Sequence, residues 1–298
     1  MKNKVTRKAY AKINLSLDVL RRRPDGYHEV RMIMQTVNLF DELTFSLNED
    51  PNAPRTTLEF KNIPSKADLG PVEKNLIYRA SEMILDEYGL STKVCISLSK
   101  NIPVAAGMAG GSTDAAAVFH GLNELLDLNM SIESMCRLGV KIGADVPFCI
   151  MGGTMLSEGI GEILSPVPTP PEAILLIVKP KISVSTKFVY ENLHADSLSE
   201  HPDVDGMIKM LRDGCLDGMC DLLGNVLETV TVKEYPVIKS IKDVMKENGA
   251  RGALMSGSGP TVFGIWPNTK EGLEKAETAA ESVRKKGLAT QIFVTEFH

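Results

Sequence analysis

The sequence has no excess of basic residues. Charged residues make up 24% of its 298 positions, and the formal net charge is -5. A chain with this balance offers no basic field that could hold nucleic acid or an anionic membrane surface. The composition therefore favours a small molecule as the partner.

Long apolar runs are also missing. The longest, such as residues 173–178, have about six residues, whereas a helix that spans a bilayer needs roughly 20. The N-terminal residues enter a strand pattern directly and lack the apolar region of a signal peptide. We therefore expect a cytoplasmic protein.

Cysteine is scarce and shows no pairing pattern. The five cysteines are scattered and form no CxxC pair, which argues against a disulfide framework and against a structural zinc site. The five histidines are spread just as widely. The sequence therefore indicates no cluster of metal-ligating residues.

The amount of apolar material is enough for a substantial core. Hydrophobic residues make up 43% of the chain, and two domains fit its length better than one. The segment 165–171 (SPVPTPP) can continue neither a helix nor a central strand. We predict a boundary there, with one domain over residues 1–164 and a second over residues 165–298.

Periodic segments predict strands and helices in the first domain. Residues 13–19 alternate between apolar and polar, which is typical of a half-buried strand, and Lys12 and Asn14 would share its wet face. Alternation also predicts strands near 37–47 and 94–98. Helices are expected at 75–88, at 115–126 and, after an N-cap at Ser131, at 132–142.

The second domain shows the order strand, helix, strand, strand, helix, strand. This order is that of a ferredoxin-like fold. The expected strands are 174–178, 252–256, 261–265 and 289–296, and the expected helices are 237–248 and 269–286. Taken with the first domain, the chain is predicted to be of the α+β class.

The common phosphate-binding motifs are absent, since no GxxxxGK and no GxGxxG before a helix occurs. Instead, residues 103–119 (PVAAGMAGGSTDAAAVF) are mostly small, contain no Lys or Arg, and enter a helix near Ser112. Gly107, Gly110 and Gly111 would let a phosphate reach the backbone. Amides at the helix start would attract it, helped by roughly half a positive charge from the helix dipole. On spacing alone, an ordinary glycine-rich turn with a serine cap explains the segment equally well.

The polar residues after these glycines allow two roles. Ser112 and Thr113 could cap the helix or reach a magnesium ion, and Asp114 would lie in the first turn.

A second candidate is the segment 143–148 (GADVPF). Asp145 follows the predicted end of a helix, where the negative end of the dipole would raise its pKa towards that of a useful base. An ordinary surface aspartate is the more frequent outcome. Lys12 and Asn14 are candidate partners, although a lysine on a polar strand face is most often solvated.

A third candidate is the segment 23–30 (RPDGYHEV). Its Pro-Asp-Gly turn presents Tyr27 and His28, which could stack on a base and read its edge. The alternative is a half-buried tyrosine and a solvated histidine. A second glycine-rich segment, 255–264 (MSGSGPTVFG), is either a plain hairpin or a segment that closes over phosphates.

Together, five segments resemble the GHMP kinase superfamily in their order along the chain. The resemblance implies a ribosomal-protein-S5-like N-terminal domain and a ferredoxin-like C-terminal domain. The segments are AKINLSL (11–17), DGYHEV (25–30), IPVAAGMAGGSTDAAA (102–117), GADVPF (143–148) and MSGSGPTVFG (255–264).

The segments are most similar to the branch of the superfamily that phosphorylates a hydroxyl of a methylerythritol bearing a cytidine diphosphate, in the non-mevalonate isoprenoid pathway. The resemblance thus implies ATP and Mg²⁺ as cofactors and a small-molecule substrate. It implies no nucleic acid or membrane partner, and a monomer or homodimer.

The resemblance also implies roles for individual residues. Asp145 would accept the hydroxyl proton, and Lys12 would orient the hydroxyl and stabilise developing charge. Asn75 would contact adenine. The cytidine-bearing substrate would be held by Asn14, Tyr27, His28 and Tyr190. The ATP phosphates would be wrapped by Pro103, Val104, Ala105, Ala106, Gly107, Met108, Ala109, Gly110, Gly111, Ser112 and Thr113.

Two positions depart from the superfamily pattern. Met108 and Ala109 stand where many relatives have Leu and Gly, and Ala109 puts in doubt a left-handed backbone at that position. Two other functions stay open: a GHMP kinase for homoserine or mevalonate, whose substrates have no base to stack, and a non-catalytic nucleotide-binding regulator of the same fold.

Overall fold

The computed structural model describes residues 3–61 and 71–298. Over these residues the chain forms two compact units. The first unit contains the described residues of Met1–Ala11, Leu39–Val104 and Ala109–Gly152. The second unit contains Lys12–Asn38, Ala105–Met108 and Gly153–His298. The units interleave along the sequence, whereas the predicted boundary divides the chain once, after residue 164.

Two long strands, β1 (Lys4–Arg22) and β2 (His28–Leu47), contribute residues to both units. They are neighbours in a sheet whose described strands follow the order β3-β4-β2-β1-β8, with β5 pairing with β2 and β6. The other strands are β3 (Thr56–Lys61), β4 (Val94–Ser99), β5 (Thr154–Gly159), β6 (Ile163–Pro166) and β8 (Gly224–Asn225). The predicted strands near 37–47 and 94–98 are therefore confirmed.

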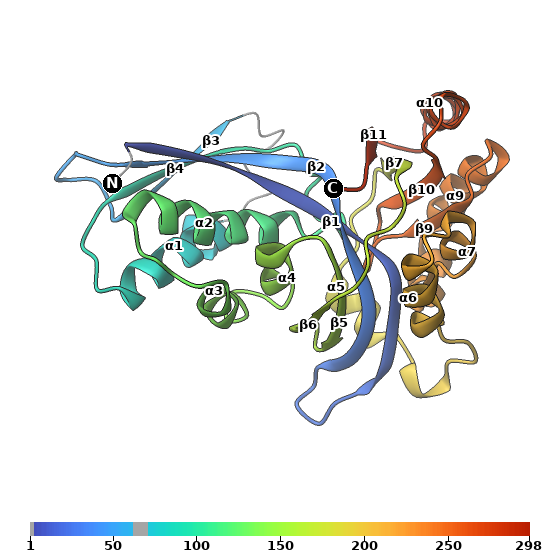
Figure 1. Ribbon diagram of the computed structural model, residues 1–298, viewed down its shortest axis with the longest axis horizontal. Helices are drawn as coiled ribbons and strands as arrows, with labels where there is room; N and C mark the ends of the chain where they lie inside the picture. The colour runs from blue at the N-terminus through green and yellow to red at the C-terminus, as the bar shows by residue number, and fades with distance from the viewer. Residues whose placement is uncertain (1–2, 62–70) are drawn as a thin grey trace. The chain divides into compact units, whose positions relative to one another are not determined.

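In the first unit, helices pack on one face of the sheet (Figure 1). Here β4 pairs antiparallel with β2 and parallel with β3. The helices are the short 3-10 helix η2 (Val72–Lys74), α1 (Leu76–Glu87), α2 (Gly110–Leu126), α3 (Ile132–Gly139) and α4 (Val146–Met151). The predicted cap at Ser131 is confirmed, because Ser131 Oγ accepts from Ser134 N (3.2 Å). Asn75, predicted as the first residue of a helix, is instead the N-cap of α1, and its Oδ1 accepts from Ile77 N (2.9 Å).

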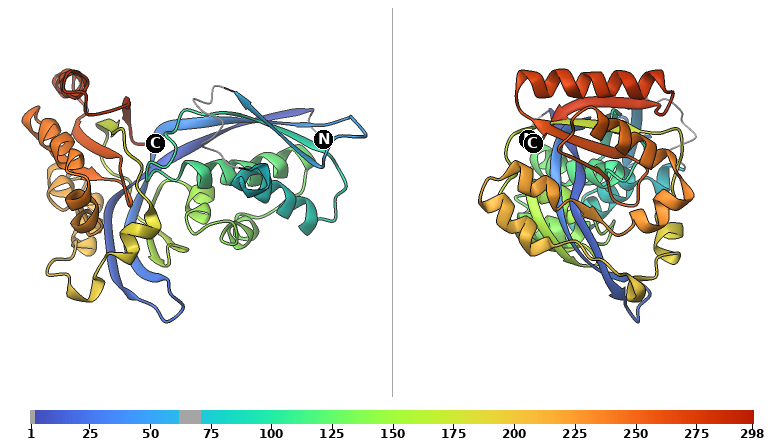
Figure 2. Two further views of the ribbon diagram at one scale, coloured as in Figure 1. Left: turned by 180° about the vertical axis from the view of Figure 1, so that it is seen from behind. Right: turned by 90° about the vertical axis from the view of Figure 1, so that its right-hand side faces the viewer.

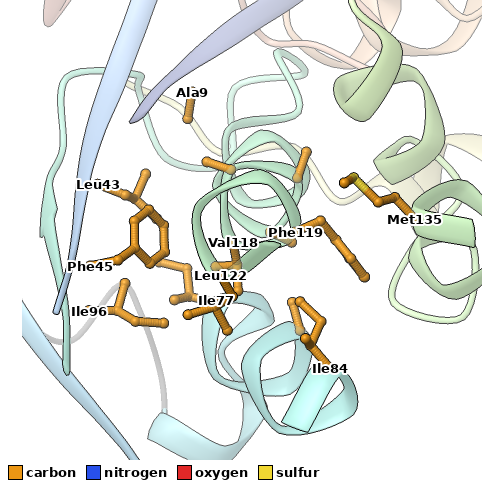
Figure 3. Close-up of a cluster of buried hydrophobic side chains, with 14 of the residues drawn as sticks. Ala9, Leu43, Phe45, Ile77, Ile84, Ile96, Val118, Phe119, Leu122 and Met135 are labelled. Atoms are coloured by element: carbon orange, nitrogen blue, oxygen red, sulfur yellow. The ribbon is translucent and has the colours of Figure 1, made fainter. Parts of the chain in front are cut away.

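The apolar core of the first unit fixes α2 against the sheet (Figure 3). Phe45 of β2 and Phe119 of α2 are both fully buried. Gly121 lets the helix approach closely, because a Cβ at this position would overlap the ring of Phe45. Ile77 and Ile84 of α1 complete this layer. The N-terminal turn of α2 therefore rests on a well-packed scaffold.

In the second unit, a separate sheet has the order β11-β7-β10-β9 and is antiparallel throughout. Helices α9 and α10 pack on it (Figure 1 and Figure 2). The elements are β7 (Ala173–Lys179), α9 (Val237–Glu247), β9 (Gly252–Met255), β10 (Val262–Pro267), α10 (Lys270–Lys285) and β11 (Gln291–Glu296). This is the predicted ferredoxin-like order.

Several helices between β7 and α9 were not predicted. They are α5 (Thr186–Glu191), the 3-10 helix η3 (Ala195–Ser197), α6 (Val204–Arg212), α7 (Leu216–Asp221) and α8 (Glu228–Glu234). A signal for α6 is present in the sequence. Asp203 Oδ1 accepts from Gly206 N (2.8 Å), and Val204, Met207 and Leu211 are buried at helical spacing.

The prediction of a half-buried strand at 13–19 is right about the strand and wrong about its wet face. Lys12 and Asp18 are each 5% exposed, and Asn14 and Ser16 are fully buried. Alternation reports which side chains are polar but not what covers them. Here the polar face finds partners within the second unit: Asp18 Oδ1, for example, lies 2.8 Å from His201 Nδ1.

Candidate active site

The turn between β4 and α2 contains three residues with left-handed backbone conformation. Ala105, Gly107 and Ala109 have φ values of 50°, 72° and 57°. Ala109 is the N-cap of α2 and makes no side-chain cap, so the expectation that Ser112 or Thr113 caps the helix is wrong. The doubt about a left-handed backbone at Ala109 is wrong as well, and this conformation costs an alanine roughly 1–2 kcal/mol.

The turn leaves backbone amides at the start of α2 without partners inside the helix. The bond from Thr113 N to Ala109 O (2.9 Å) is the first of the helical pattern, so the N–H groups of residues 110–112 precede it. A 17-residue helix adds the positive end of its dipole at the same place. The start of α2 can therefore bind an anion through peptide groups.

Asp145 lies at the start of a helix and not at the end of one. The helix α3 stops at Gly139, and Asp145 is the N-cap residue of α4. The premise of the prediction is therefore wrong, because Asp145 lies at the positive end of a helix dipole and not at the negative end. The helix at 132–142 was predicted too long because the apolar spacing continues through residues 140–142 after the helix has ended.

Within the first unit, the loop that carries Asp145 lies beside the start of α2. A Cβ built on Gly143 would be 4.0 Å from Ser112 Oγ, and α4 packs against α2. Asp145 itself is half-buried. The loop that carries this carboxylate thus lies next to the group of amides suited to phosphate.

In the second unit, Lys12 and Asn14 project from β1 and contact each other. Lys12 Nζ donates to Asn14 Oδ1 (2.8 Å), and Asn14 Nδ2 contacts Met32 Sδ (3.2 Å). The backbone N of Lys12 donates to Met108 O (3.2 Å), which ties the strand to the glycine-rich turn.

The second glycine-rich segment also meets this turn. Ser256 Oγ donates to Gly107 O (2.9 Å). Only glycine fits at position 107, because a Cβ there would overlap the backbone oxygen of Ser256. On the other side of this segment, a Cβ on Gly257 would lie 3.7 Å from Asn14 Oδ1. Residues 105–108, the loop between β9 and β10, and the polar face of β1 therefore form one cluster.

Aromatic residues gather elsewhere in the second unit. The rings of His28 and Tyr190 have centroids 5.0 Å apart and are tilted by 43°. Tyr27, in the turn before β2, has 60% of its surface exposed. Burial, and secondarily the charge of Arg22, lowers the pKa of His28, so its ring is neutral at pH 7.

Comparison with known proteins places these features in a family. The profile of the GHMP kinases N terminal domain matches residues 75–153, and that of the GHMP kinases C terminal domain matches residues 198–288. The chain belongs to the GHMP kinases. The predicted resemblance and the predicted α+β GHMP fold are thereby confirmed.

This GHMP kinase has relatives of similar length. A Lachnoclostridium phytofermentans protein named 4-diphosphocytidyl-2-C-methyl-D-erythritol kinase is 49% identical, over 98% of this chain and 97% of its own. A Caldicellulosiruptor bescii protein of the same name is 46% identical, over 95% and 96% of the two chains.

Solved structures agree with this fold. The crystal structure of a 4-(cytidine 5'-diphospho)-2C-methyl-D-erythritol kinase is 31% identical, with a TM-score of 0.79 over 98% of this chain and 99% of that one. L. major mevalonate kinase is 18% identical, with a TM-score of 0.77 over 100% and 98%, and shares the fold.

Within the second unit, several predicted site residues contact one another. Lys12, Asn14, Gly107 and Met108 meet in the second unit, as do His28 and Tyr190. Asp145 belongs to the first unit and Lys12 to the second, so the pairing of these two residues stays a prediction. The adenine contact of Asn75, whose side chain caps α1, also stays a prediction.

A buried ion cluster beneath α2 was missed from the sequence. Lys100 Nζ lies 2.7 Å from Asp114 Oδ2 and 2.5 Å from Asp41 Oδ2, and all three side chains are at least 95% buried. Asp41 Oδ1 also accepts from the backbone N of Ile102 (2.8 Å). A Cβ on Gly110 would lie 3.2 Å from Lys100 Nζ, so the ammonium sits under the first residue of α2.

The cluster holds one cation between two carboxylates. Burial raises the pKa of Asp114 well above its usual range, with Lys100 acting in the opposite direction. Burial alone would lower the pKa of Lys100, but the two carboxylates raise it overall. Asp114 Oδ1 is buried with no hydrogen-bond partner among the described residues. No spacing rule links residues 41, 100 and 114, so only the fold reveals the cluster.

Among the described residues, no three His, Cys, Asp or Glu side chains form a group that could hold a metal ion. Within the same residues, none of the helices has the length and apolar character required to cross a bilayer.

Proposed function

We propose that this GHMP kinase is a cytoplasmic enzyme that transfers the γ-phosphate of ATP to the 2-hydroxyl of 4-diphosphocytidyl-2-C-methyl-D-erythritol. The observation that favours this substrate over those of other GHMP kinases is the ring pair of His28 and Tyr190, 5.0 Å apart. Homoserine and mevalonate carry no base for these rings. The names of relatives up to 49% identical over nearly the whole chain support the same choice.

The cytosine would be recognised by aromatic contact and by one polar edge. Tyr27 presents an exposed ring on which a base can stack, worth about 1–3 kcal/mol. Neutral His28 offers one donor and one acceptor, which suits an edge that carries both kinds of group. Tyr190, whose ring lies 5.0 Å from that of His28, would complete the aromatic sandwich around the base.

The phosphates of ATP would be bound by the turn between β4 and α2. The N–H groups at positions 110–112 and the helix dipole attract the negative oxygens. Gly107 allows the backbone to approach them because it has no side chain. Residues 103–109 would wrap the remaining phosphate surface.

The chemical step requires a base and a cation. Asp145 would accept the proton of the substrate hydroxyl as its oxygen forms a bond to the γ-phosphorus. The bond from that phosphorus to the β–γ bridging oxygen then breaks, and its electron pair leaves with ADP. Lys12 Nζ would stabilise the charge that develops on the transferred group, and Asn14 Oδ1 fixes that ammonium at 2.8 Å.

Magnesium bound with ATP neutralises phosphate charge. The residues present fit such an ion only in part. Ser112 Oγ would lie 4.0 Å from a Cβ built on Gly143, in the loop that carries Asp145. Hydroxyl and carboxylate oxygens are of the kind that Mg²⁺ prefers. Thr113 does not fit, because its hydroxyl is buried and donates to Tyr10 O (2.7 Å). We propose Ser112 as the residue of α2 that would hold the ion.

A coupled assay of ADP formation tests the proposal. Purified protein is given ATP and Mg²⁺ with the cytidine-diphosphate methylerythritol, with homoserine, or with mevalonate, in parallel. We expect substrate-dependent ADP release with the first alcohol alone, and inhibition of that reaction by CMP. Turnover of homoserine or mevalonate without CMP inhibition would instead support a small-alcohol kinase. Binding of ATP with no turnover of any alcohol would support a non-catalytic regulator.

A further inference from the structure

The loop between β9 and β10 is held by one buried amide side chain. Asn225 is 7% exposed and lies on β8. Its Nδ2 donates to both Met255 O (2.8 Å) and Gly257 O (2.8 Å), and its Oδ1 accepts from Leu227 N (3.0 Å). All three hydrogen bonds go to backbone groups, so Asn225 fixes the path of the chain at residues 255–257.

Two neighbours of Asn225 hold the same loop. Glu228 Oε1 accepts from Met255 N (2.9 Å), and its other carboxylate oxygen accepts from Lys242 Nζ (2.6 Å). Thr231 Oγ1 makes a longer contact with Ser258 O (3.4 Å). The segment 225–231 therefore supports the loop along its length, with Asn225 as the residue that makes two bonds to it.

The loop in turn shapes residues 105–108. Ser256 Oγ donates to Gly107 O (2.9 Å), and the position of a Cβ on Gly257 is 3.0 Å from the same oxygen. Next along the chain, Met108 O accepts from the backbone N of Lys12 (3.2 Å). A displacement of residues 255–257 would therefore move Gly107. It would also disturb the neighbouring hydrogen bond from the backbone N of Lys12 to Met108 O.

We propose that Asn225 is a positioning residue for phosphoryl transfer, which holds the loop 255–259 against Gly107 so that the phosphate turn and Lys12 keep their working geometry. This inference rests on the proposed function. Asn225 touches neither substrate nor the reacting atoms in this scheme. It acts through the backbone of the loop.

A second asparagine offers a matched control. Asn123 also clamps a backbone loop, since its Nδ2 donates to Met130 O (3.2 Å) and its Oδ1 accepts from Met130 N (2.8 Å). It lies 13 residues beyond Gly110 on α2, about 20 Å along the helix axis. Loss of either clamp leaves backbone groups unpaired, and both variants should melt a few degrees below the wild type.

The experiment compares Asn225→Ala and Asn123→Ala well below their melting temperatures. For Asn225→Ala we expect kcat/KM for ATP to fall by about tenfold to a hundredfold, the range typical of a small misplacement of reacting groups. The affinity for CMP should stay within about twofold of the wild-type value. The Asn225 amide donates to Met255 O and Gly257 O, and not to the ring pair of His28 and Tyr190. For Asn123→Ala both quantities should match the wild type.

Equal kinetics for the two alanine variants would overturn the proposal, since Asn225 would then be only a stabilising residue. If Asn225→Ala does not fold, Ser256→Ala takes its place. This variant removes the bond to Gly107 O and should show the same pattern with a smaller loss. Wild-type kinetics in Ser256→Ala would then count against the positioning role.

Amide hydrogen exchange separates this inference from the proposed function. If the wild-type protein forms no ADP, the function is wrong, and exchange at residues 105–108 decides the role of Asn225. Faster exchange there in Asn225→Ala, but not in Asn123→Ala, would support the clamp. Unchanged exchange would overturn it.

Discussion

The two units fix their glycine-rich segments by different physical means. In the first unit, the start of α2 rests on a buried ion cluster in which Lys100 bridges Asp41 and Asp114. In the second unit, the loop 255–257 is held by the neutral amide of Asn225. An ion cluster in the interior depends on the balance of its charges, whereas an amide clamp does not. Removal of a charged side chain in the first unit should therefore lower the free energy of unfolding or the turnover number. Removal of an aromatic ring in the second unit should weaken binding of the cytidine substrate.

The strongest test of this contrast is Asp145→Asn. We expect kcat to fall by about 10²–10⁴-fold, because a general base of this kind contributes that much. Affinity for ATP and for CMP, measured by calorimetry, should stay close to the wild type. Asp243→Asn, which alters an exposed pair with Lys239 (2.7 Å), serves as the control. Undiminished turnover in Asp145→Asn would remove this carboxylate from the mechanism.

The next largest effect is expected from Lys100→Met. Loss of the ammonium leaves two buried carboxyl groups without the cation they share, which should lower the free energy of unfolding by about 3–5 kcal/mol. Urea denaturation measures it. Lys239→Met removes a lysine from an exposed pair and should cost less than about 1 kcal/mol. Similar losses in the two variants would show that the buried cluster contributes no more to the free energy of unfolding than an exposed ion pair does.

In the second unit, Tyr27→Ala should act on binding and not on chemistry. Loss of a stacking ring worth about 1–3 kcal/mol predicts a rise in KM for the cytidine substrate of roughly 5- to 150-fold, with kcat nearly unchanged. Tyr27→Phe keeps the ring and should behave like the wild type. A fall in kcat with no change in KM would contradict a role in cytosine stacking.

The smallest effect is expected from Asp114→Asn, and it depends on pH. Since burial raises the pKa of Asp114 in the folded protein, the wild type loses stability as pH rises from the unfolded pKa towards the folded one. The variant lacks this loss. Its free energy of unfolding should therefore rise relative to that of the wild type as the pH increases above about 3.9, the usual pKa of an aspartate in an unfolded chain. A difference that does not change with pH would show that the carboxyl of Asp114 is ionised in the folded state throughout.

Much of the secondary structure follows from local signals. Thr269 caps α10, Ser131 caps α3, and the apolar run at 173–178 becomes the buried strand β7. The order of the last six predicted elements was enough to indicate the ferredoxin-like sheet. Such features depend on neighbours within a few residues, which a single sequence displays directly.

The misses arise where distant parts of the chain decide the outcome. The polar face of β1 is buried because other segments cover Asn14 and Asp18. The left-handed conformation of Ala109 is kept although glycine would adopt it at lower cost, since the surrounding turn and α2 fix the backbone there. The cluster of Lys100 joins residues 41 and 114, which no periodicity connects.

The sequence offered candidate site residues one by one but not their geometry, and their roles stay predictions. The family pattern indicated Lys12, Gly107, His28 and Tyr190, and the structure adds which of them touch. Asn225 carried no sequence signal, because a buried asparagine that clamps a loop looks like any other asparagine.

The interleaving of the units has a consequence for synthesis on the ribosome. Residues 12–38 emerge early, yet most of the second unit to which they belong, residues 153–298, is made last. The first unit needs nothing beyond Gly152 and can fold sooner. For part of translation, the nascent chain therefore exposes strand segments that await their partners, a state prone to association and suited to chaperone binding.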